Sequence, residues 1–332
     1  MLRFPLLLGL LLSLTACQDD SPATPPSDSV RSGDAGIDAL SQQLQTNPTA
    51  AAYVQRANLY YERGNFVDAV ADLENALQRD SSQLTYYYAL ADAYLDADRP
   101  PAAQRTLERA ERRFPDRLET YLRLGEVRLI TQDYAAAEAI LNRATELSPP
   151  SAEARYLLAQ VYAEGGDTSR ALTAALAATR LDPDLTDGFL LLGNLAAARD
   201  QPAAADYFDA AVASRPSDPL AREARADYYY RQGDLPRAIA EYRQLALIDR
   251  QIVGANLNAG LLLLELDSFP QARAEFNIAV GNDPANATAR YYRGYAEQLL
   301  GKPAAARRDY TTALRLDPTF TPAREALQAL AE

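Results

Sequence analysis

The sequence predicts an all-α fold built from repeated helix–turn–helix units, and a fixed spacing of small residues is the main observation behind it. Of the 332 residues, 48% are hydrophobic, which is ample material for a core. Small residues recur at steps of 34, with one step of 33, in the series Ala57, Ala91, Gly125, Ala159, Gly193, Ala226, Gly260 and Gly294. A second series with the same steps is Ala69, Ala103, Ala137, Ala171, Ala204, Ala238, Ala272 and Ala306. Self-similarity at a fixed period is the signature of a repeat protein.

Proline marks the ends of most units, at Pro115, Pro149, Pro183, Pro216, Pro284 and Pro318. Proline fits the junction between one helix and the next because its missing N–H is not required there. Each unit is therefore expected to contain a helix, a turn and a second helix. The one short step falls between Gly193 and Ala204, so the fifth unit should lack one turn residue within ARDQP.

Aromatic and large apolar residues between the small positions complete a pattern that resembles the tetratricopeptide repeat family. In the first unit the pattern runs through Tyr53, Ala57, Tyr60, Gly64, Phe66, Ala69, Leu73 and Ala76. The resemblance covers about residues 50–318 and implies an all-α, right-handed α-solenoid of about eight helical hairpins. Arg128 departs from the pattern where a large aromatic residue is usual, and Arg250 replaces a closing proline.

Two further helices are expected to flank the repeats. Ile37, Leu40 and Leu44 stand at helical spacing before the first unit. After Pro322, the amphipathic segment at about residues 320–331 should cover the apolar face of the eighth unit as a cap. With both flanking helices, the solenoid would span residues 34–332.

The N-terminus has the layout of a bacterial signal peptide over residues 1–16. Arg3 precedes an apolar run, and the segment Leu14-Thr15-Ala16-Cys17 resembles the lipobox of bacterial lipoproteins. The resemblance implies that Cys17 becomes the lipidated first residue of the mature chain. A free or interchain-paired thiol is the alternative for this lone cysteine. Residues 17–33 are rich in Ser, Pro, Asp and Gly, which is typical of a disordered tether.

The residues after Cys17 bear on localisation. Gln18 stands where an aspartate would retain a lipoprotein in the inner membrane of some bacteria, so the outer membrane is favoured. Asp19 and Asp20 resemble acidic surface-export tags of some lipoproteins. We therefore expect a lipid-anchored protein of the bacterial outer membrane that faces either the periplasm or the cell surface.

Composition argues against several kinds of chemistry. The chain contains no His, no Trp and one Cys, so catalysis by His-activated nucleophiles and zinc sites of the usual Cys/His type are excluded. Asp96 and Asp98 lie close in sequence but lack the pattern of a calcium loop. Gly165-Gly166-Asp167 lacks the lysine of a phosphate loop and is interpreted as a turn. We expect no enzymatic activity, no cofactor and no metal. The net charge of −12 argues against nucleic acid and against a basic patch that binds anionic lipid.

The family resemblance implies that the first helices of successive units line a concave groove. One row of groove positions carries Tyr88, Tyr156 and Tyr291, with Val54, Leu122, Leu190, Glu223 and Leu257 between them. A second row contains Asn58, Asp92, Glu126, Asn194, Asp227 and Tyr295, and a third contains Tyr61 and Tyr230. The groove should become more apolar around Leu257, Leu261 and Leu264. Packing between units is the alternative role for each single tyrosine.

These positions suit recognition of an extended peptide. Tyrosine offers contact area and a hydroxyl, and the two asparagines could hydrogen-bond a peptide backbone. Asp92, Glu126 and Asp227 would favour Lys or Arg in the ligand. The expected function is a scaffold or adaptor in the bacterial envelope that binds a segment of another exported or membrane protein. A glycan- or nutrient-binding surface lipoprotein is the alternative, disfavoured because the chain has no Trp for stacking on sugars.

Overall fold

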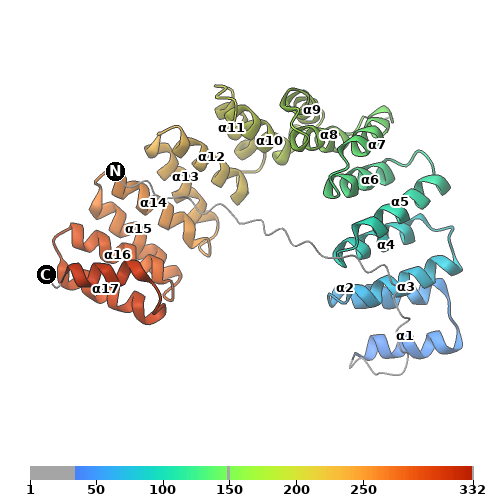
Figure 1. Cartoon of the computed structure of the whole chain (residues 1–332), viewed down its shortest axis with the longest axis horizontal. Coiled ribbons are helices and arrows are strands. Elements are labelled where there is room, and N and C mark those ends of the chain that lie inside the picture. The colour runs from blue at the N-terminus through green and yellow to red at the C-terminus, as the bar shows by residue number, and fades with distance from the viewer. Residues whose placement is uncertain (1–33, 148–149, 331–332) are drawn as a thin grey trace. The chain divides into compact units, whose positions relative to one another are not determined.

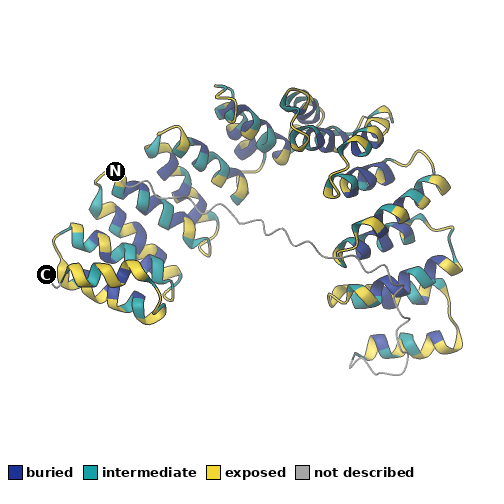
Figure 2. Cartoon of the chain, in the orientation of Figure 1, coloured by how far each residue is buried: buried dark blue, intermediate teal, exposed yellow. Residues whose placement is uncertain are grey.

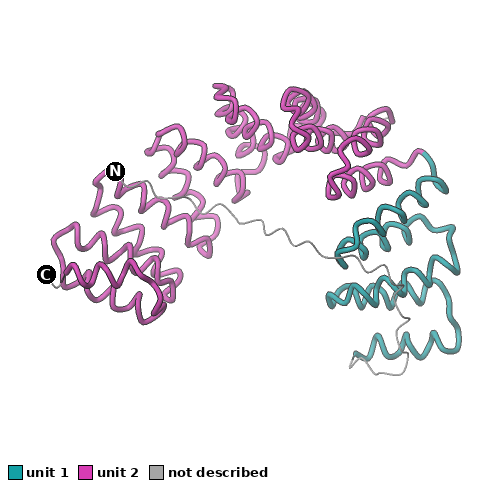
Figure 3. The backbone as a smooth tube through the Cα atoms, viewed as in Figure 1, with its two compact units in different colours: residues 1–115 teal, residues 116–332 magenta. Residues whose placement is uncertain are grey.

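The computed structural model describes residues 34–147 and 150–330. It divides into two compact units, residues 1–115 (unit 1) and residues 116–332 (unit 2) (Figure 3). All regular secondary structure in the described residues is α-helical (Figure 1). The predicted signal peptide, Cys17 and the tether at 17–33 lie outside the described residues.

Unit 1 consists of one helix followed by two hairpins. Helix α1 (Ala35–Thr46) precedes α2 (Ala50–Glu62) and α3 (Phe66–Arg79), which form the first hairpin. The second hairpin is α4 (Leu84–Asp96) and α5 (Pro100–Arg113). Each helix packs on the one before it. This is the order that the 34-residue period predicts.

Unit 2 continues the pattern with six hairpins and a final helix. The helices are α6 (Leu118–Ile130), α7 (Tyr134–Glu146), α8 (Ala152–Glu164), α9 (Thr168–Leu181), α10 (Thr186–Ala197), α11 (Ala204–Ser214), α12 (Pro219–Arg231), α13 (Leu235–Ile248), α14 (Val253–Glu265), α15 (Phe269–Asn282), α16 (Ala287–Leu299), α17 (Pro303–Leu316) and α18 (Thr321–Ala329). The second helix of each hairpin packs on the first helix of the next. The predicted α-solenoid of helical hairpins is confirmed. We call α2, α4 and so on to α16 the first helices, and their hairpin partners the second helices.

A residue with left-handed backbone ends the turn of each hairpin. The position recurs through Gly64, Asp98, Gln132, Gly166, Asp200, Gly233, Asp267 and Gly301, whose φ angles lie between 51° and 84°. This conformation lets the turn satisfy the last carbonyls of the first helix, as when the backbone N–H of Asn65 donates to the Tyr60 carbonyl at 2.9 Å. Glycine adopts it freely, and Asp tolerates it better than most residues.

The missing residue of the fifth unit shortens a helix. Helix α11 begins at Ala204 itself, whereas α3 begins at Phe66, three residues before the equivalent Ala69. The chain between α10 and α11 still makes the left-handed turn at Asp200, so the deletion is absorbed by the first turn of α11. The repeat phase therefore resumes unchanged at Ala204.

Close helix contact in each hairpin depends on the small residue of the first helix. A Cβ added at Gly260 would lie 2.4 Å from Cε1 of Phe276, whose ring is fully buried on α15. Gly125 faces Leu141, Gly193 faces Phe208 and Gly294 faces Tyr310 in the same manner. In both units the buried residues lie on the helix faces that pack against each other (Figure 2). The small residues of the series that begins at Ala57 thus lie where the two helices of each hairpin come closest together.

The residue just before each small residue of the first helix packs against a residue of the second helix, and we call this pair of positions the neighbouring layer. The layer is charged in some repeats and apolar in others. Arg56 and Asp72 form a buried ion pair whose Nε–Oδ2 and Nη2–Oδ1 distances are both 2.7 Å. Arg293 contacts Asp309 in the same bidentate way at 2.8 and 2.6 Å. In the second hairpin of unit 1, the equivalent residues are Leu90 and Thr106, both buried. The layer therefore accepts either a matched ion pair or a mainly apolar filling.

Both flanking helices cover hairpin ends. Ile37 and Leu44 of α1 are buried, and Arg56 also donates to the Ser41 hydroxyl of α1 at 2.8 Å. At the other end, Ala323 of α18 is fully buried and packs in one cluster with Tyr310 of α17. Leu327 of α18 and Leu330, which follows the helix, pack against the same cluster, as the sequence predicts.

Replacement of Gly260 by Ala should destabilise the protein by about 1–3 kcal/mol, because the buried Phe276 ring cannot yield to the added methyl group. Gly254 lies on the same helix with no atom within 4 Å of an added Cβ, so Gly254→Ala should stabilise by roughly 0.5–1 kcal/mol. Thermal and urea unfolding followed by circular dichroism would measure both. Equal changes in the free energy of unfolding for the two variants would contradict the close contact between Gly260 and Phe276.

Replacement of Asp72 by Thr alone should cost about 3–5 kcal/mol, because it leaves the buried Arg56 guanidinium without its carboxylate. The double variant Arg56→Leu/Asp72→Thr copies the filling of the second hairpin and should recover most of that loss. The same unfolding measurement applies. A double variant no more stable than the single one would show that the two layers are not interchangeable.

Candidate functional site

All of the predicted groove residues lie on first helices and none of them is fully buried. Asn58 and Tyr61 lie on α2, Tyr88 and Asp92 on α4, Glu126 on α6, Tyr156 on α8, Asn194 on α10, Asp227 and Tyr230 on α12, and Tyr291 and Tyr295 on α16. We call this set of side chains the first-helix face.

In unit 1, Tyr61 connects the two first helices. Its hydroxyl donates to the Asp96 carboxylate of α4, and its ring contacts Phe66 edge-on at 5.2 Å. The hydrogen bond to Asp96, followed by burial and by the charges of Asp96 and Asp92, raises the pKa of Tyr61 to about 12. The phenol therefore keeps its proton at neutral pH and remains a donor. Because its ring is still 38% exposed, Tyr61 serves both as a tie between helices and as contact surface.

Helix α12 of unit 2 carries two neighbouring carboxylates together with three arginines. Glu223 and Asp227 are one helical turn apart, and partial desolvation followed by the charge of Asp227 raises the pKa of Glu223. Asp227 also accepts a hydrogen bond from the hydroxyl of Tyr242 on α13. Burial and that hydrogen bond raise the pKa of Tyr242 above its ordinary value. A cationic side chain beside Glu223 would relieve the repulsion between the two carboxylates.

The tyrosines of the first-helix face differ in how far they are engaged in packing. Tyr291 is a packing residue, because its ring lies within 5.1 to 6.4 Å of the rings of Tyr292, Tyr295, Tyr310 and Phe320. Tyr295 stands at the edge of this cluster and is 36% exposed. The Tyr156 hydroxyl accepts a hydrogen bond from Gln160 at 3.1 Å, and burial followed by the charge of Asp187 raises its pKa.

One position of the predicted groove rows is wrong. Leu122 is 4% exposed and belongs to the core, because α6 packs against α8 as well as against α7. Leu257, Leu261 and Leu264 are partly buried and pack on the core of unit 2, so some of their apolar surface remains outside it. The repeat phase placed all four on the same side of a helix but could not tell how closely the neighbouring first helix approaches.

The described residues offer no metal-binding cluster of three or more His, Cys, Asp or Glu. Asp96, a weak calcium candidate from sequence, instead accepts the hydrogen bond from Tyr61. Within residues 34–147 and 150–330, none of the helices combines the length and the apolar character needed to cross a bilayer.

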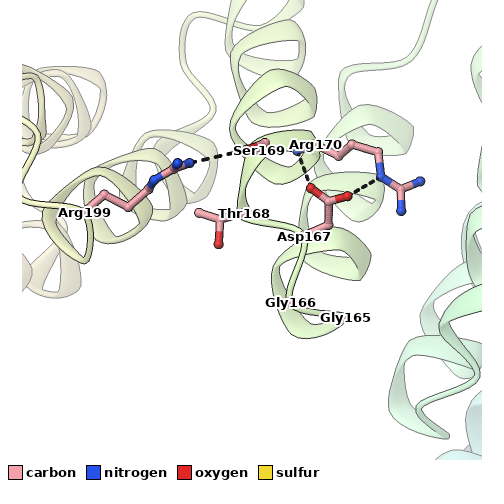
Figure 4. Close-up of a pocket in the computed structure, with 7 residues that line it drawn as sticks. All are labelled: Gly165, Gly166, Asp167, Thr168, Ser169, Arg170 and Arg199. Atoms are coloured by element: carbon pink, nitrogen blue, oxygen red, sulfur yellow. Dashed lines mark hydrogen bonds and ion pairs between the residues drawn. The ribbon is translucent and has the colours of Figure 1, made fainter.

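A hollow of about 610 Å³ lies beside the start of α9 (Figure 4). Asp167 caps this helix by accepting from the backbone N–H of Arg170 at 2.9 Å, and its second oxygen accepts from Arg170 Nε at 2.7 Å. Arg199 reaches the Ser169 hydroxyl at 3.5 Å. Because a carboxylate already occupies the helix N-terminus, the glycines before it form a turn and not a phosphate cradle, as the sequence indicates.

Sequence reasoning missed a cluster of arginines on α5 and on the residue before it. Arg99, Arg105 and Arg109 line a cavity of about 390 Å³ together with Glu74, Tyr94, Ala102 and Thr106. The signal was present as a local run of arginines between residues 99 and 117. The negative net charge of the whole chain gives no sign of this local excess of arginine.

Comparison with known sequences decides the family. Sequence profiles of the tetratricopeptide repeat match residues 54–103, 88–152, 190–251 and 257–320, and a second profile of the same repeat matches residues 129–195. The chain belongs to the tetratricopeptide repeat family. The family resemblance predicted from the spacing is confirmed, and membership supports a role as a protein–protein interaction scaffold. Tetratricopeptide repeat proteins are typically scaffolds without enzymatic activity.

Individual relatives are distant. Tetratricopeptide repeat protein 16 of Macaca fascicularis and that of Homo sapiens are each 33% identical over 101 residues, which is 28% of this chain and 12% of theirs. The C-terminal part of a tetratricopeptide repeat protein from Cytophaga hutchinsonii is similar in structure with a TM-score of 0.60 at 17% identity, covering 74% of this chain and 99% of that one. YrrB, described as a protein of this repeat type with an unusual peptide-binding site, is 28% identical with a TM-score of 0.43, covering 57% of this chain and 98% of its own.

Proposed function

We propose that this tetratricopeptide repeat protein is a membrane-anchored scaffold of the bacterial envelope that binds an extended segment of another exported protein on its first-helix face. The observation that carries the proposal is the chemistry of that face. Exposed Asn58, Glu126, Asn194 and Tyr295 stand on first helices, and half-buried tyrosines and carboxylates accompany them.

The side chains of the first-helix face match an extended peptide with basic and aromatic or apolar residues. Asn58 and Asn194 each offer an amide donor and an amide acceptor to a peptide backbone. Glu223 and Asp227 offer paired carboxylates whose mutual repulsion a Lys or Arg would relieve. Tyr295 offers a partly exposed ring beside the aromatic cluster of α16, α17 and the residue before α18.

The triple variant Tyr88→Ala/Glu126→Ala/Tyr156→Ala should lose captured partners by about tenfold or more, because hot-spot tyrosines and charges dominate peptide recognition. The matched control Val67→Ala/Leu247→Ala/Ile278→Ala removes exposed apolar side chains from second helices and should retain partners. A photo-cross-linking residue at Asn194, with one at Ile278 for comparison, would identify what is captured. Full retention by the triple variant would exclude the first-helix face as the site.

The same variants discriminate between a peptide and a glycan ligand. A fluorescent oligosaccharide that binds the wild-type chain and fails to bind the triple variant would favour a nutrient-binding lipoprotein instead. Binding of cross-linked protein partners with no oligosaccharide binding supports the scaffold.

The anchor is tested separately through Cys17. Cys17→Ala should abolish incorporation of labelled palmitate and move the protein from the membrane to the soluble fraction, since several acyl chains on one residue give stable anchoring. Protease shaving of intact cells would then distinguish a surface-facing from a periplasmic protein. Undiminished palmitate labelling of the variant would refute lipidation at Cys17 while leaving the scaffold proposal open to its own test.

A further inference from the structure

Unit 1 carries a local excess of arginine in a chain whose net charge is −12. Five arginines lie on α5 or directly before it, and all are exposed: Arg99, Arg105, Arg109, Arg112 and Arg113. The acidic residues over the same stretch are Glu108 and Glu111. Arg105, Arg109 and Arg112 follow each other at helical spacing and therefore share one side of α5.

Three of these arginines converge on one cavity. Arg99, Arg105 and Arg109 line the space of about 390 Å³ that separates α5 from Glu74 on α3, which we call the arginine pocket. The guanidinium of Arg99 stacks over the Tyr94 ring at 5.0 Å from its centroid, and that of Arg109 over the Tyr87 ring at 5.6 Å. Rings of this kind orient a guanidinium without neutralising its charge.

Within residues 34–147 and 150–330, the positive charges of the arginine pocket are only partly balanced. Among the described residues, no carboxylate forms an ion pair with Arg99, Arg105 or Arg109. The one carboxylate of the pocket, Glu74, accepts a hydrogen bond from the Tyr94 hydroxyl. Three cations and one engaged carboxylate leave a net positive recess.

Helix capping does not account for Arg99. The equivalent positions of four other hairpins carry Asn65, Asp133, Asp167 and Asp234, whose side chains accept a backbone N–H of the second helix. Arg99 makes no such bond, and α11, α15 and α17 also begin without a side-chain cap. The position therefore tolerates an uncapped helix, and the Arg99 side chain lines the arginine pocket instead.

We propose that the arginine pocket binds carboxylate side chains from an acidic segment of a partner protein, independently of the first-helix face. Guanidinium groups match carboxylates in bidentate geometry, and a recess between helices admits single side chains. An anionic membrane is disfavoured because the chain as a whole carries a net charge of −12. Nucleic acid is disfavoured because Glu74 lies in the pocket and Glu108 and Glu111 lie on the same helix.

The test uses the full chain and a fluorescein-labelled peptide in which Glu and Ser alternate. Fluorescence anisotropy should show binding that weakens as salt is raised, whereas the matched Gln/Ser peptide should bind about tenfold more weakly or not at all. Arg105→Gln/Arg109→Gln should lower the affinity for the Glu/Ser peptide by about tenfold or more, because each lost guanidinium removes charge-assisted hydrogen bonds.

A matched control is available in the eighth repeat. Arg308 is the equivalent of Arg105 and Arg315 the equivalent of Arg112, and both are exposed on α17. Arg308→Gln/Arg315→Gln removes the same amount of charge from a second helix and should change the affinity by no more than about twofold. Equal losses in the two double variants would overturn the proposal, because they would indicate attraction to the overall charge of the chain.

Arg99→Asn separates binding from stability. The variant gives α5 the kind of asparagine cap that Asn65 gives α3. The melting temperature should therefore rise or stay unchanged, while the affinity for the Glu/Ser peptide falls. Undiminished affinity in this variant and in the pocket double variant would overturn the proposal.

Other occupants are distinguished with the same variants. Phosphatidylglycerol vesicles or inorganic phosphate that bind as tightly as the peptide, and lose binding in Arg105→Gln/Arg109→Gln, would assign the pocket to phosphate and overturn the proposal. Dimerisation in analytical ultracentrifugation that the double variant abolishes would assign the pocket to a second copy of this chain and overturn the proposal of a different partner.

Discussion

The contact between a small residue on the first helix and a bulky residue on the second is the constraint on which each hairpin depends. At Gly260 the Phe276 ring occupies the space that a Cβ would need, and at Gly125 the side chain of Leu141 does the same. Because the two backbones approach this closely, the turn that joins them has little freedom, which is why it uses a left-handed residue in every repeat. Helix packing and turn geometry are therefore two consequences of one contact.

The layer next to this contact tolerates different chemistry because only its volume and its charge balance are constrained. Arg56 with Asp72 is a paired charge, and Leu90 with Thr106 is mainly apolar. Glu275 shows a third solution, since it accepts from Asn256 on α14 at 3.0 Å and from Arg243 on α13 at 2.7 Å. A buried charge is acceptable here because each one meets a partner from a neighbouring helix.

The fold could be predicted from sequence because the small positions are fixed by backbone approach and hence recur with the period. Side-chain partnerships could not, because they depend on residues that vary between repeats. The sequence shows Arg128 as a departure from the repeat pattern, but it does not show that Arg128 donates to the Ala136 carbonyl at 3.0 Å and so ties α6 to α7. Leu122 was assigned to the wrong environment for the same reason. The arginine pocket escaped notice because net charge averages over regions that lie far apart in the chain.

Structural roles and the proposed recognition roles overlap on the first helices and separate on the second helices. Tyr61 ties α2 to α4 and Asp227 holds Tyr242, so changing either for specificity also changes how the hairpins are joined. Arg105 of α5, by contrast, is exposed and carries no ion pair among the described residues, so its replacement disturbs little packing. The exposed side of a second helix can therefore acquire a new charge pattern at small cost in stability, whereas the first-helix face must keep the ties that hold successive hairpins together.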